Sequence, residues 1–275
     1  MPELPEVETI RRDLAPRVEG RRITSVTIAP DTGKPVPVIK GTDSATFREG
    51  VVGATITMAD RRGKYLVFRL DSGLLLVVHL RMTGALLHRK ADAPPDPFLR
   101  AILRLDDGTE LRFTDVRKFG GLWLTDDFEL VTTGLGPEPL NEEFTADIVA
   151  NAVRGRKAPV KSIILDQRRI AGIGNIYADE ACFAAHIDPR RHGLTLTEDE
   201  VAALHDSVRK VLAFGVESRG ASFRDYKDAD GNSGSMHMHV KVFRRTGKEC
   251  YDCGSVIERV VIGGRSTHFC PTCQV

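Results

Sequence analysis

The spacing of hydrophobic residues changes once along the chain, which divides it into a strand-rich first half and a helical second half. In the first half, apolar and polar positions alternate, a pattern typical of half-buried β-strands. The Asp107-Gly108 dipeptide lies between two such runs and predicts a hairpin. Residues 20 to about 130 are therefore predicted to form a mostly antiparallel sandwich or barrel. The predicted strands are 22–29, 53–59, 64–70, 74–80, 99–105 and 110–113.

Beyond the turn-rich stretch 134–139, the hydrophobic period becomes about 3.6 residues, as in amphipathic helices. Thr197 and Glu200 have the spacing of a capping box at the start of the last helix. Residues 217–236 are polar and contain glycine, so we expect a flexible loop, followed from residue 240 by short strands. The predicted helices are 145–153, 160–169, 175–185 and 198–217.

The first residues also predict a helix, from Leu4 to Leu14, with Val7 and Ile10 on its apolar face. Extending this helix backwards points Glu3 into the apolar sector, whereas Glu8 points away. A carboxyl group against apolar surface suits general-acid chemistry. If Met1 is trimmed, Pro2 becomes a secondary amine, which can attack a sugar carbon covalently. Taken alone, however, these residues are more commonly just a proline-led, acidic helix start.

Composition sets outer limits on the function. The 275 residues carry a net charge of +1, with 41% hydrophobic and 28% charged residues, an ordinary globular profile. Total charge therefore says nothing about nucleic acid, and only local basic clusters bear on it. No apolar run is long enough to span a membrane and no signal peptide is apparent, so we expect a cytoplasmic protein with no membrane partner.

Four of the five cysteines lie in the last 26 residues, as two Cys-x-x-Cys pairs around a sixteen-residue spacer. This spacing is typical of a structural zinc site, because four thiolates complete a tetrahedron and leave no open position. One zinc ion is therefore expected, with His268 as a bystander and Cys182 in the core of a helix. The predicted ligands are Cys250, Cys253, Cys270 and Cys273.

Three further motifs are candidates for binding a polyanion. The turn 170–175 has two glycines before a helix start, where a phosphate can reach backbone N–H groups, although a simple helix cap also explains it. The basic cluster at 154–169, which includes Lys161, favours phosphate binding. Lys64 begins a strand and is either a phosphate ligand or an ordinary edge lysine. Met82, Arg117 and Phe119 follow strand ends, where they can fill the void left by a flipped base, although core packing also explains Met82 and Phe119.

Taken together, these motifs resemble the formamidopyrimidine-DNA glycosylase family of base-excision repair enzymes, over the whole chain. The matching stretches are Pro2-Glu3-Leu4-Pro5-Glu6-Val7-Glu8, Gly63-Lys64-Tyr65-Leu66, Leu135-Gly136-Pro137-Glu138-Pro139-Leu140, Gly172-Ile173-Gly174-Asn175-Ile176-Tyr177 and Gly264-Arg265-Ser266-Thr267.

The resemblance implies an α+β multidomain protein with an N-terminal antiparallel β-sandwich flanked by helices (1–133), a helix–two-turn–helix domain with a lesion-covering loop (134–239) and a C-terminal β-hairpin zinc finger (240–275). It also implies a monomer that acts on damaged double-stranded DNA as a glycosylase and abasic-site lyase. Oxidised purines, namely 8-oxoguanine and formamidopyrimidines, are the expected substrates, and β,δ-elimination is the expected cleavage.

The resemblance also assigns a role to each matching residue. It implies Pro2 as the nucleophile that forms an iminium, Glu3 as the proton shuttle, and Lys64 and Arg265 as catalytic phosphate-binding residues. It implies DNA binding by Asn175, Met82, Arg117 and Phe119 and a lesion-pocket acid in Glu6, while DNA binding by Lys161 is expected from the basic cluster.

Several positions depart from the family pattern and leave lesion and opposite-base preference open. Arg81, Val116 and Lys118 stand where glycine, proline and arginine are usual, and Glu249 replaces a proline. Segments 235–239 and 243–245 are also unusual. Two alternatives are an endonuclease VIII-type glycosylase for oxidised pyrimidines and a non-catalytic zinc-finger binder of damaged DNA. Leu4 argues against the first, and Pro2, Glu3 and Lys64 argue against the second.

Overall fold

The computed structural model describes residues 1–29, 37–132 and 134–275, which divide into two compact units. Unit 1 comprises Met1–Thr133 and Ser218–Ser235, and unit 2 comprises Gly134–Glu217 and Met236–Val275. Thr133, at a predicted domain boundary, lies outside the described residues. The three predicted domains therefore stay a prediction, and each unit is described by itself.

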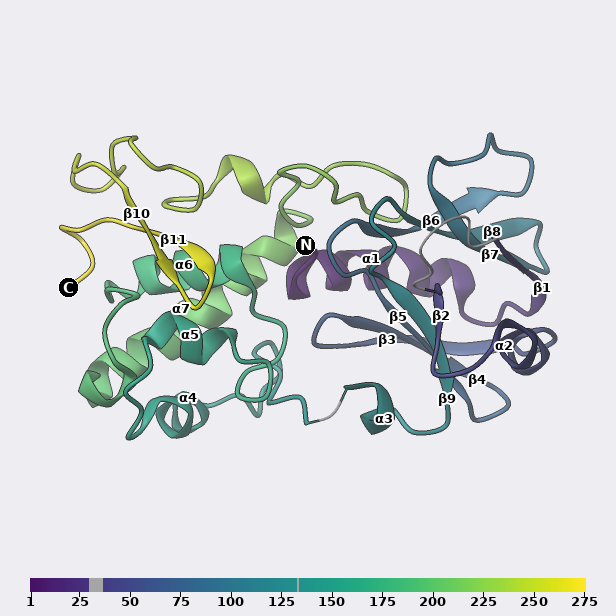
Figure 1. The fold of residues 1–275 in the computed structure, drawn as a ribbon, viewed down its shortest axis with the longest axis horizontal. Coiled ribbons are helices and arrows are strands. Elements are labelled where there is room, and N and C mark those ends of the chain that lie inside the picture. The colour runs from purple at the N-terminus through teal and green to yellow at the C-terminus, as the bar shows by residue number, and fades with distance from the viewer. Residues whose placement is uncertain (30–36, 133) are drawn as a thin grey trace. The chain divides into compact units, whose positions relative to one another are not determined.

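Unit 1 is a β-sandwich. Its described strands form one sheet in the order β1-β7-β8-β6 and a second in the order β2-β9-β5-β4-β3 (Figure 1). Neighbouring strands run antiparallel, except that the short β2 runs parallel to β9. The strands are β1 Ile23–Ile28, β2 Ile39–Lys40, β3 Ile56–Arg62, β4 Tyr65–Leu70, β5 Leu75–His79, β6 Gly84–Lys90, β7 Leu99–Leu105, β8 Thr109–Asp115 and β9 Gly121–Thr125.

The first helix, α1 (Leu4–Val18), carries the apolar stripe that the sequence predicted. Val7, Ile10 and Leu14 are fully buried in a core that also contains residues of both sheets, and the helix packs against β3 and β4. Glu8 does point away from this core, but it is only 7% exposed because arginine side chains cover it.

Unit 2 is mostly helical and ends in a β-hairpin. Helices α4 and α6 pack against α7, and α6 also contacts β11. Thr197 and Glu200 form the predicted capping box of α7, with Glu200 accepting from the Thr197 N–H at 2.8 Å. The elements are α4 Ala146–Val153, α5 Val160–Leu165, α6 Asn175–Ala184, η1 Gly193–Thr195, α7 Glu198–Glu217, η2 Met236–Met238, β10 Glu258–Ile262 and β11 Arg265–Phe269.

Some elements of the described chain were not predicted. Helix α2 (Ser44–Val51) buries only Phe47 and Val51, too few residues for a visible period, and α3 (Glu129–Thr132) is a single turn. Strand β6 was missed because its first half is buried on both faces and therefore does not alternate. Helix α5 ends at Leu165, four residues earlier than expected, where the Gln167 amide donates to the Leu165 carbonyl oxygen at 2.9 Å.

The segment 218–235, predicted as a flexible loop, has no helix or strand but is attached to unit 1. Tyr226 and Ala229 belong to the buried core, and the Ala229 carbonyl oxygen accepts from the His88 N–H at 2.8 Å. Ala221 and Ser235 form an isolated bridge that closes the loop. Because the segment is mostly polar, the sequence did not predict that two apolar residues, Tyr226 and Ala229, attach it to the core.

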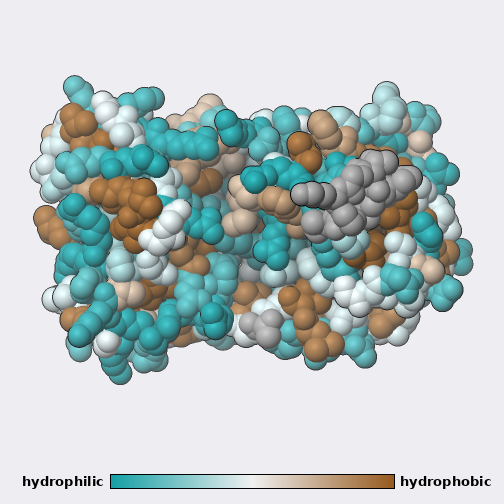
Figure 2. Space-filling model, viewed as in Figure 1, coloured by the Kyte–Doolittle hydropathy of each residue, from teal (hydrophilic) through white to brown (hydrophobic). Residues whose placement is uncertain are grey.

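Hydrophobic residues on the surface form separate groups among hydrophilic ones on the face shown in Figure 2. Exposed hydrophobic side chains of the described residues include Met82, Phe119 and Tyr251. Within the described part of the chain, every helix is too short or too polar to cross a lipid bilayer.

We expect Ile10→Ala to lower the free energy of unfolding by about 2–5 kcal/mol, because Ile10 is fully buried and truncation leaves a cavity. Urea denaturation measures this change. Glu49→Ala, at an exposed position of α2, is the control and should stay within about 0.5 kcal/mol of the parent protein. Equal losses in both variants would contradict the predicted packing of α1.

Candidate functional site

The beginning of the chain is held in place by its own helix start. Pro2 is buried, Glu3 is the N-cap residue of α1 and only 2% exposed, and Met1 is 44% exposed. The Glu6 carboxylate reaches back and accepts from the Glu3 backbone N–H at 2.7 Å, as in a capping box. Glu3 is therefore buried, and its backbone is fixed beside Pro2.

Glu6 is fully buried and joins this helix start to the segment 218–235. Its second carboxylate oxygen accepts from the Ala221 N–H at 2.7 Å, and its carbonyl oxygen accepts from the Tyr226 hydroxyl at 3.3 Å. Burial, together with the charge of Glu6, strongly raises the pKa of Tyr226, so this phenol remains a hydrogen-bond donor. The acid predicted for the lesion pocket thus also organises the backbone around it.

Lys64 follows a turn that is tied to α1 through Glu8 and Arg61. The Arg61 guanidinium lies 3.1 Å from the Glu8 carboxylate and donates to the Gly63 carbonyl oxygen at 3.0 Å. Burial would raise the pKa of Glu8, but hydrogen bonds from Arg11 and the neighbouring Arg12 outweigh it and lower the pKa to about 2. A permanently charged carboxylate therefore holds the turn before Lys64, which is itself buried.

The three predicted void-filling residues come together on two adjoining loops of unit 1. The Arg117 guanidinium lies over the Phe119 ring, 4.6 Å from its centroid, and donates to the Met82 sulfur at 3.1 Å. Met82 and Phe119 are 42% and 46% exposed, so they do not belong to the core. The core-packing alternative for these two side chains is therefore wrong.

Asp115, to which the sequence assigned no role, holds these loops together. Its buried carboxylate accepts from the N–H groups of Arg117 and Gly120, at 3.1 and 2.8 Å, and from the Thr83 hydroxyl. Because an aspartate so near a loop tip resembles an ordinary turn residue, only the three-dimensional contacts revealed this function.

The turn before Met82 is fixed by a neutral histidine. Burial, with the charges of Arg81 and Lys64, lowers the pKa of His79 to about 3, so its Nδ1 accepts the Arg81 N–H at 2.9 Å. Arg81 has a φ of 52°, in the left-handed region that favours glycine. This conformation explains why the resemblance expects glycine there.

In unit 2, Lys161 lies inside the protein. It is fully buried, with its ammonium 2.7 Å from the Asp179 carboxylate, and it donates to the Ser266 carbonyl oxygen and the Thr267 hydroxyl. Asp179 also accepts from the backbone and ring nitrogens of His268. The predicted direct DNA contact does not fit this burial, because the ammonium is occupied in holding the hairpin.

Asn175 and Arg265 lie close to the contact between Lys161 and the hairpin residues Ser266 and Thr267. The Asn175 side-chain amide donates to the Ser266 carbonyl oxygen at 2.9 Å, while the Arg265 side chain is exposed at the start of β11. The hairpin turns through Gly263 and Gly264, whose φ values of 54° and 74° suit a two-residue type I′ turn. Unit 2 therefore brings Lys161, Asn175 and Arg265 close together.

The four predicted zinc ligands gather at one point. Their sulfur atoms lie within 4.8 Å of one another, including a Cys253–Cys270 separation of 3.4 Å. Zinc–sulfur bonds of about 2.3 Å place tetrahedral thiolates about 3.8 Å apart, so the cluster fits one structural zinc ion. Cys182 is fully buried in α6, and burial raises the pKa of its thiol, as expected for a core cysteine.

Helix α6 secures the segment that leads to the zinc site through Glu180. This buried carboxylate accepts from the N–H groups of Lys241, Val242 and Phe243 at 2.8–3.0 Å. Burial raises its pKa despite these donors. Asp179 and Glu180 thus fasten the hairpin and the segment leading to the zinc site to the same helix. Sequence reasoning missed this role, although two adjacent acids in an apolar helix were the available signal.

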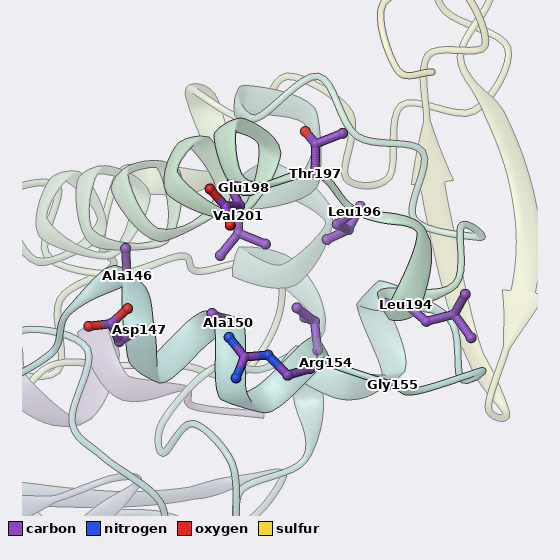
Figure 3. Close-up of a pocket in the computed structure, with 12 residues that line it drawn as sticks. Ala146, Asp147, Ala150, Arg154, Gly155, Leu194, Leu196, Thr197, Glu198 and Val201 are labelled. Carbon is purple, nitrogen blue, oxygen red and sulfur yellow. The ribbon is translucent and has the colours of Figure 1, made fainter.

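A pocket of about 450 Å³ lies in unit 2 between α4, η1 and the start of α7 (Figure 3). Apolar side chains such as Val201 and Leu196 line it together with Asp147 and Arg154. Arg154 belongs to the basic cluster at 154–169, but no other residue predicted to bind DNA or to act in catalysis lines this pocket. We therefore assign it no part in the chemistry.

Three family models match the chain in order. They are described as the formamidopyrimidine-DNA glycosylase N-terminal domain (residues 1–122), the formamidopyrimidine-DNA glycosylase H2TH domain (residues 135–227) and the zinc finger found in FPG and IleRS (residues 247–275). Together they cover most of the sequence, including the first residues and the cysteine cluster.

Individual proteins give the same result. A formamidopyrimidine-DNA glycosylase of Symbiobacterium thermophilum is 46% identical, over 100% of this chain and 89% of the relative. A crystal structure of a Lactococcus lactis FPG mutant with Fapy-dG containing DNA matches with a TM-score of 0.90, at 34% identity and 99% coverage of both chains. The Lactococcus lactis Fpg complex with abasic site containing DNA matches with a TM-score of 0.89, again at 34% identity and 99% coverage of both chains.

The fold and these matches define the class of protein as a DNA-repair glycosylase with a C-terminal zinc finger. The chain belongs to the formamidopyrimidine-DNA glycosylase family. The predicted family, fold class and zinc ion are thereby confirmed.

We expect Cys253→Ser to lower the zinc content well below one ion per chain, because one of four thiolate ligands is lost. Metal analysis of the purified protein measures this content. Cys182→Ala is the matched control, since Cys182 is not among the four clustered cysteines, and it should retain one zinc per chain. Full zinc content in Cys253→Ser would contradict the four-cysteine assignment.

Lys161→Met should lower the free energy of unfolding by about 3–5 kcal/mol, because it leaves the Asp179 carboxylate buried without its cation. Thermal and urea unfolding measure the loss. Lys157→Met removes the same charge from an exposed position nearby and should change stability by less than about 0.5 kcal/mol. Weaker DNA binding at unchanged stability would show instead that Lys161 acts as a phosphate ligand.

Proposed function

We propose that this enzyme is a bifunctional glycosylase and abasic-site lyase that removes oxidised purines from DNA through an iminium on Pro2. The observation that carries the proposal is the buried Pro2-Glu3 pair at the start of α1, fixed by Glu6, in a chain of this family. A nucleophile and a proton-transferring carboxyl group are then adjacent at the same helix end.

In the proposed reaction, removal of Met1 frees the Pro2 nitrogen, which attacks C1′ of the damaged nucleotide. The glycosidic bond breaks, and the base leaves with a proton. Glu3 transfers protons and assists opening of the sugar ring, which yields the iminium. Loss of a C2′ proton then expels the 3′ phosphate, and a second elimination expels the 5′ phosphate. The 44% exposure of Met1 makes it accessible for trimming.

Phosphate contacts belong to the same proposal. We assign Lys64, Asn175 and Arg265 to the phosphates around the extruded nucleotide. Lys161 contributes indirectly, by holding the hairpin that carries Arg265. The Met82, Arg117 and Phe119 cluster fills the space left by the base, with Arg117 contacting the orphaned cytosine. Its exposure and its rigid attachment through Asp115 support this role.

The preference for purines is proposed because the relatives are formamidopyrimidine-DNA glycosylases and because a similar protein was solved with Fapy-dG containing DNA. Glu6 would lie at the lesion pocket. The lyase step is proposed with support from the similar protein that was solved with abasic site containing DNA. A monomeric state and a cytoplasmic location stay predictions.

Borohydride reduction should trap a covalent cross-link between the protein and DNA that contains 8-oxoguanine or an abasic site. Pro2→Gly should lower trapping by orders of magnitude, because the secondary amine is lost. Glu3→Gln should slow base removal by about 10²–10⁴-fold. Pro5→Ala, which leaves the amine intact, is the control. An unaltered cross-link in Pro2→Gly would refute the nucleophile.

Two measurements separate the remaining possibilities. Intact mass shows whether Met1 is absent, and a retained methionine would leave the Pro2 nitrogen as an unreactive amide. Faster cleavage at 8-oxoguanine than at thymine glycol, each opposite its partner base, supports the purine assignment, whereas the reverse order indicates an endonuclease VIII-type enzyme. Binding of damaged DNA without any cleavage would indicate a non-catalytic binder.

A further inference from the structure

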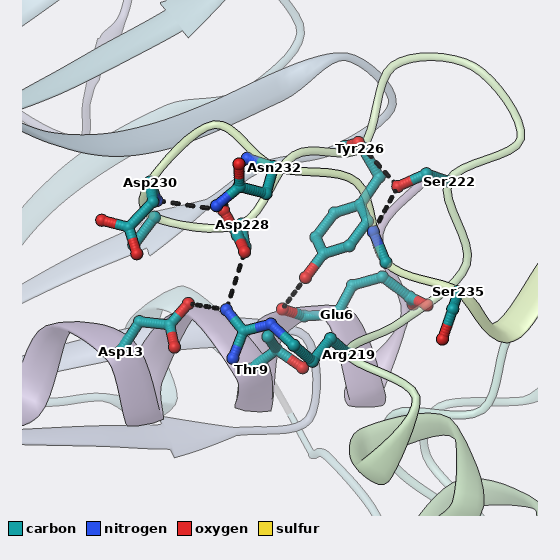
Figure 4. Close-up of polar contacts among 12 residues, drawn as sticks. Glu6, Thr9, Asp13, Arg219, Ser222, Tyr226, Asp228, Asp230, Asn232 and Ser235 are labelled. Carbon is teal, nitrogen blue, oxygen red and sulfur yellow. Dashed lines mark hydrogen bonds and ion pairs between the residues drawn. The ribbon is translucent and has the colours of Figure 1, made fainter.

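Within unit 1, one arginine joins the segment 218–235 to the middle of α1. The Arg219 guanidinium lies 2.7 Å from the Asp13 carboxylate of α1 and 2.7 Å from the Asp228 carboxylate of its own segment (Figure 4). Asp228 is only 1% exposed, and it also accepts from the N–H groups of Asp230 and Asn232. Arg219 therefore neutralises a buried carboxylate while it bridges two parts of the fold.

This ion pair fixes a constrained stretch of backbone. Arg219 and Gly220 both have left-handed φ values, 56° and 80°. A Cβ atom on Gly220 would lie 2.8 Å from Cγ of Glu6, so the backbone approaches Glu6 more closely than a side chain permits. The next residue, Ala221, can donate its N–H to Glu6 only while the chain keeps this path.

The contact continues from Glu6 to the beginning of the chain. One carboxylate oxygen of Glu6 accepts the Ala221 N–H and the other accepts the Glu3 N–H, each at 2.7 Å. Glu6 is fully buried, so loss of one donor leaves a carboxylate that must reorient to find another. A shift of Glu6 then releases the Glu3 backbone, to which Pro2 is directly bonded.

We propose that Arg219, through its pairs with Asp13 and Asp228, is a positioning residue that holds the N-terminal nucleophile in its reactive geometry. The order of contacts is Arg219 to Gly220–Ala221, then Glu6, then Glu3 and Pro2. This inference rests on the proposed catalytic role of Pro2. It assigns to the segment 218–235 a function in forming the covalent bond, beyond covering a lesion base.

Other contacts keep the far part of the segment attached without Arg219. Arg17 of α1 pairs with Asp230, and the Ala229 carbonyl oxygen accepts from the His88 N–H. Loss of Arg219 is therefore expected to loosen the path near Ala221 rather than to detach the whole segment. The loss of Arg219 should therefore slow the chemical step, because a small displacement of a nucleophile lowers the rate of bond formation strongly.

The test uses DNA with an abasic site, which has no lesion base to cover. With the full-length protein at saturating concentration, Arg219→Gln should slow formation of the borohydride-trappable iminium by about 10- to 100-fold in a single turnover. Kd for DNA with a reduced, uncleavable abasic site should stay within about twofold, because the phosphate contacts are intact. Arg219→Lys should recover much of the rate, since it can still pair with Asp13 and Asp228.

Arg224→Gln is the matched control, because it removes the same charge from an exposed position of the same segment. It should not slow the covalent step. In a Glu6→Gln background, Arg219→Gln should cause little further loss, because the contact through which it acts is already broken. If Arg219→Gln fails to fold, Asp13→Asn removes only one of the two pairs and should give a smaller slowing of the same step.

Three results would overturn the inference. In the first, Arg219→Gln slows the removal of 8-oxoguanine but leaves the rate of iminium formation on the abasic site unchanged. In the second, Arg224→Gln slows iminium formation as much as Arg219→Gln does. In the third, the losses of rate in Arg219→Gln and Glu6→Gln add fully in the double variant. If the parent protein forms no cross-link, the proposed function fails instead, and hydrogen exchange decides the inference. Faster exchange of the Glu3 N–H in Arg219→Gln supports the positioning contact, and unchanged exchange refutes it.

Discussion

The organisation of unit 1 depends on one buried carboxylate, that of Glu6, which must receive two backbone hydrogen bonds. A charged group without water is stable only when donors surround it, and Glu6 obtains them from Glu3 in its own helix and from Ala221, more than two hundred residues away. This requirement brings the loop close to the start of α1. It also fixes the backbone beside Pro2. The local contact with Glu3 and the long-range contact with Ala221 therefore both act at the place where a reactive amine is expected.

Other buried acids serve in the same way wherever an exposed functional side chain has to be held still. Asp115 accepts N–H groups from the loop that carries Arg117 and Phe119. Asp179 and Glu180 fasten the Arg265 hairpin and the segment before the zinc ligands to α6. In each case a carboxylate inside the protein determines the backbone path, and exposed side chains that we propose to contact DNA project from the loops held by Asp115 and Asp179. The residues that position a loop are thus different from the residues that we propose to contact DNA.

Much of the fold and many candidate site residues could be predicted, because their signals are local. The stripe of Val7, Ile10 and Leu14, the Asp107-Gly108 hairpin and the paired cysteines depend only on spacing along the chain. The signals failed where burial was two-sided or residues were few, as in β6 and α2. The burial of Lys161 could not be predicted, because charge clustering says nothing about burial, and Arg219 was overlooked because its two partners lie far apart in sequence.

By itself, the sequence determined the family, the order of sandwich, helical and zinc-binding parts, and the residue types available for chemistry. The tertiary structure decided which of these residues reach solvent and which are used up in holding others, as with exposed Arg265 and buried Lys161. The reason is physical: periodicity and motif spacing record short-range geometry, whereas desolvation and the pairing of buried charges depend on what the folded chain brings together.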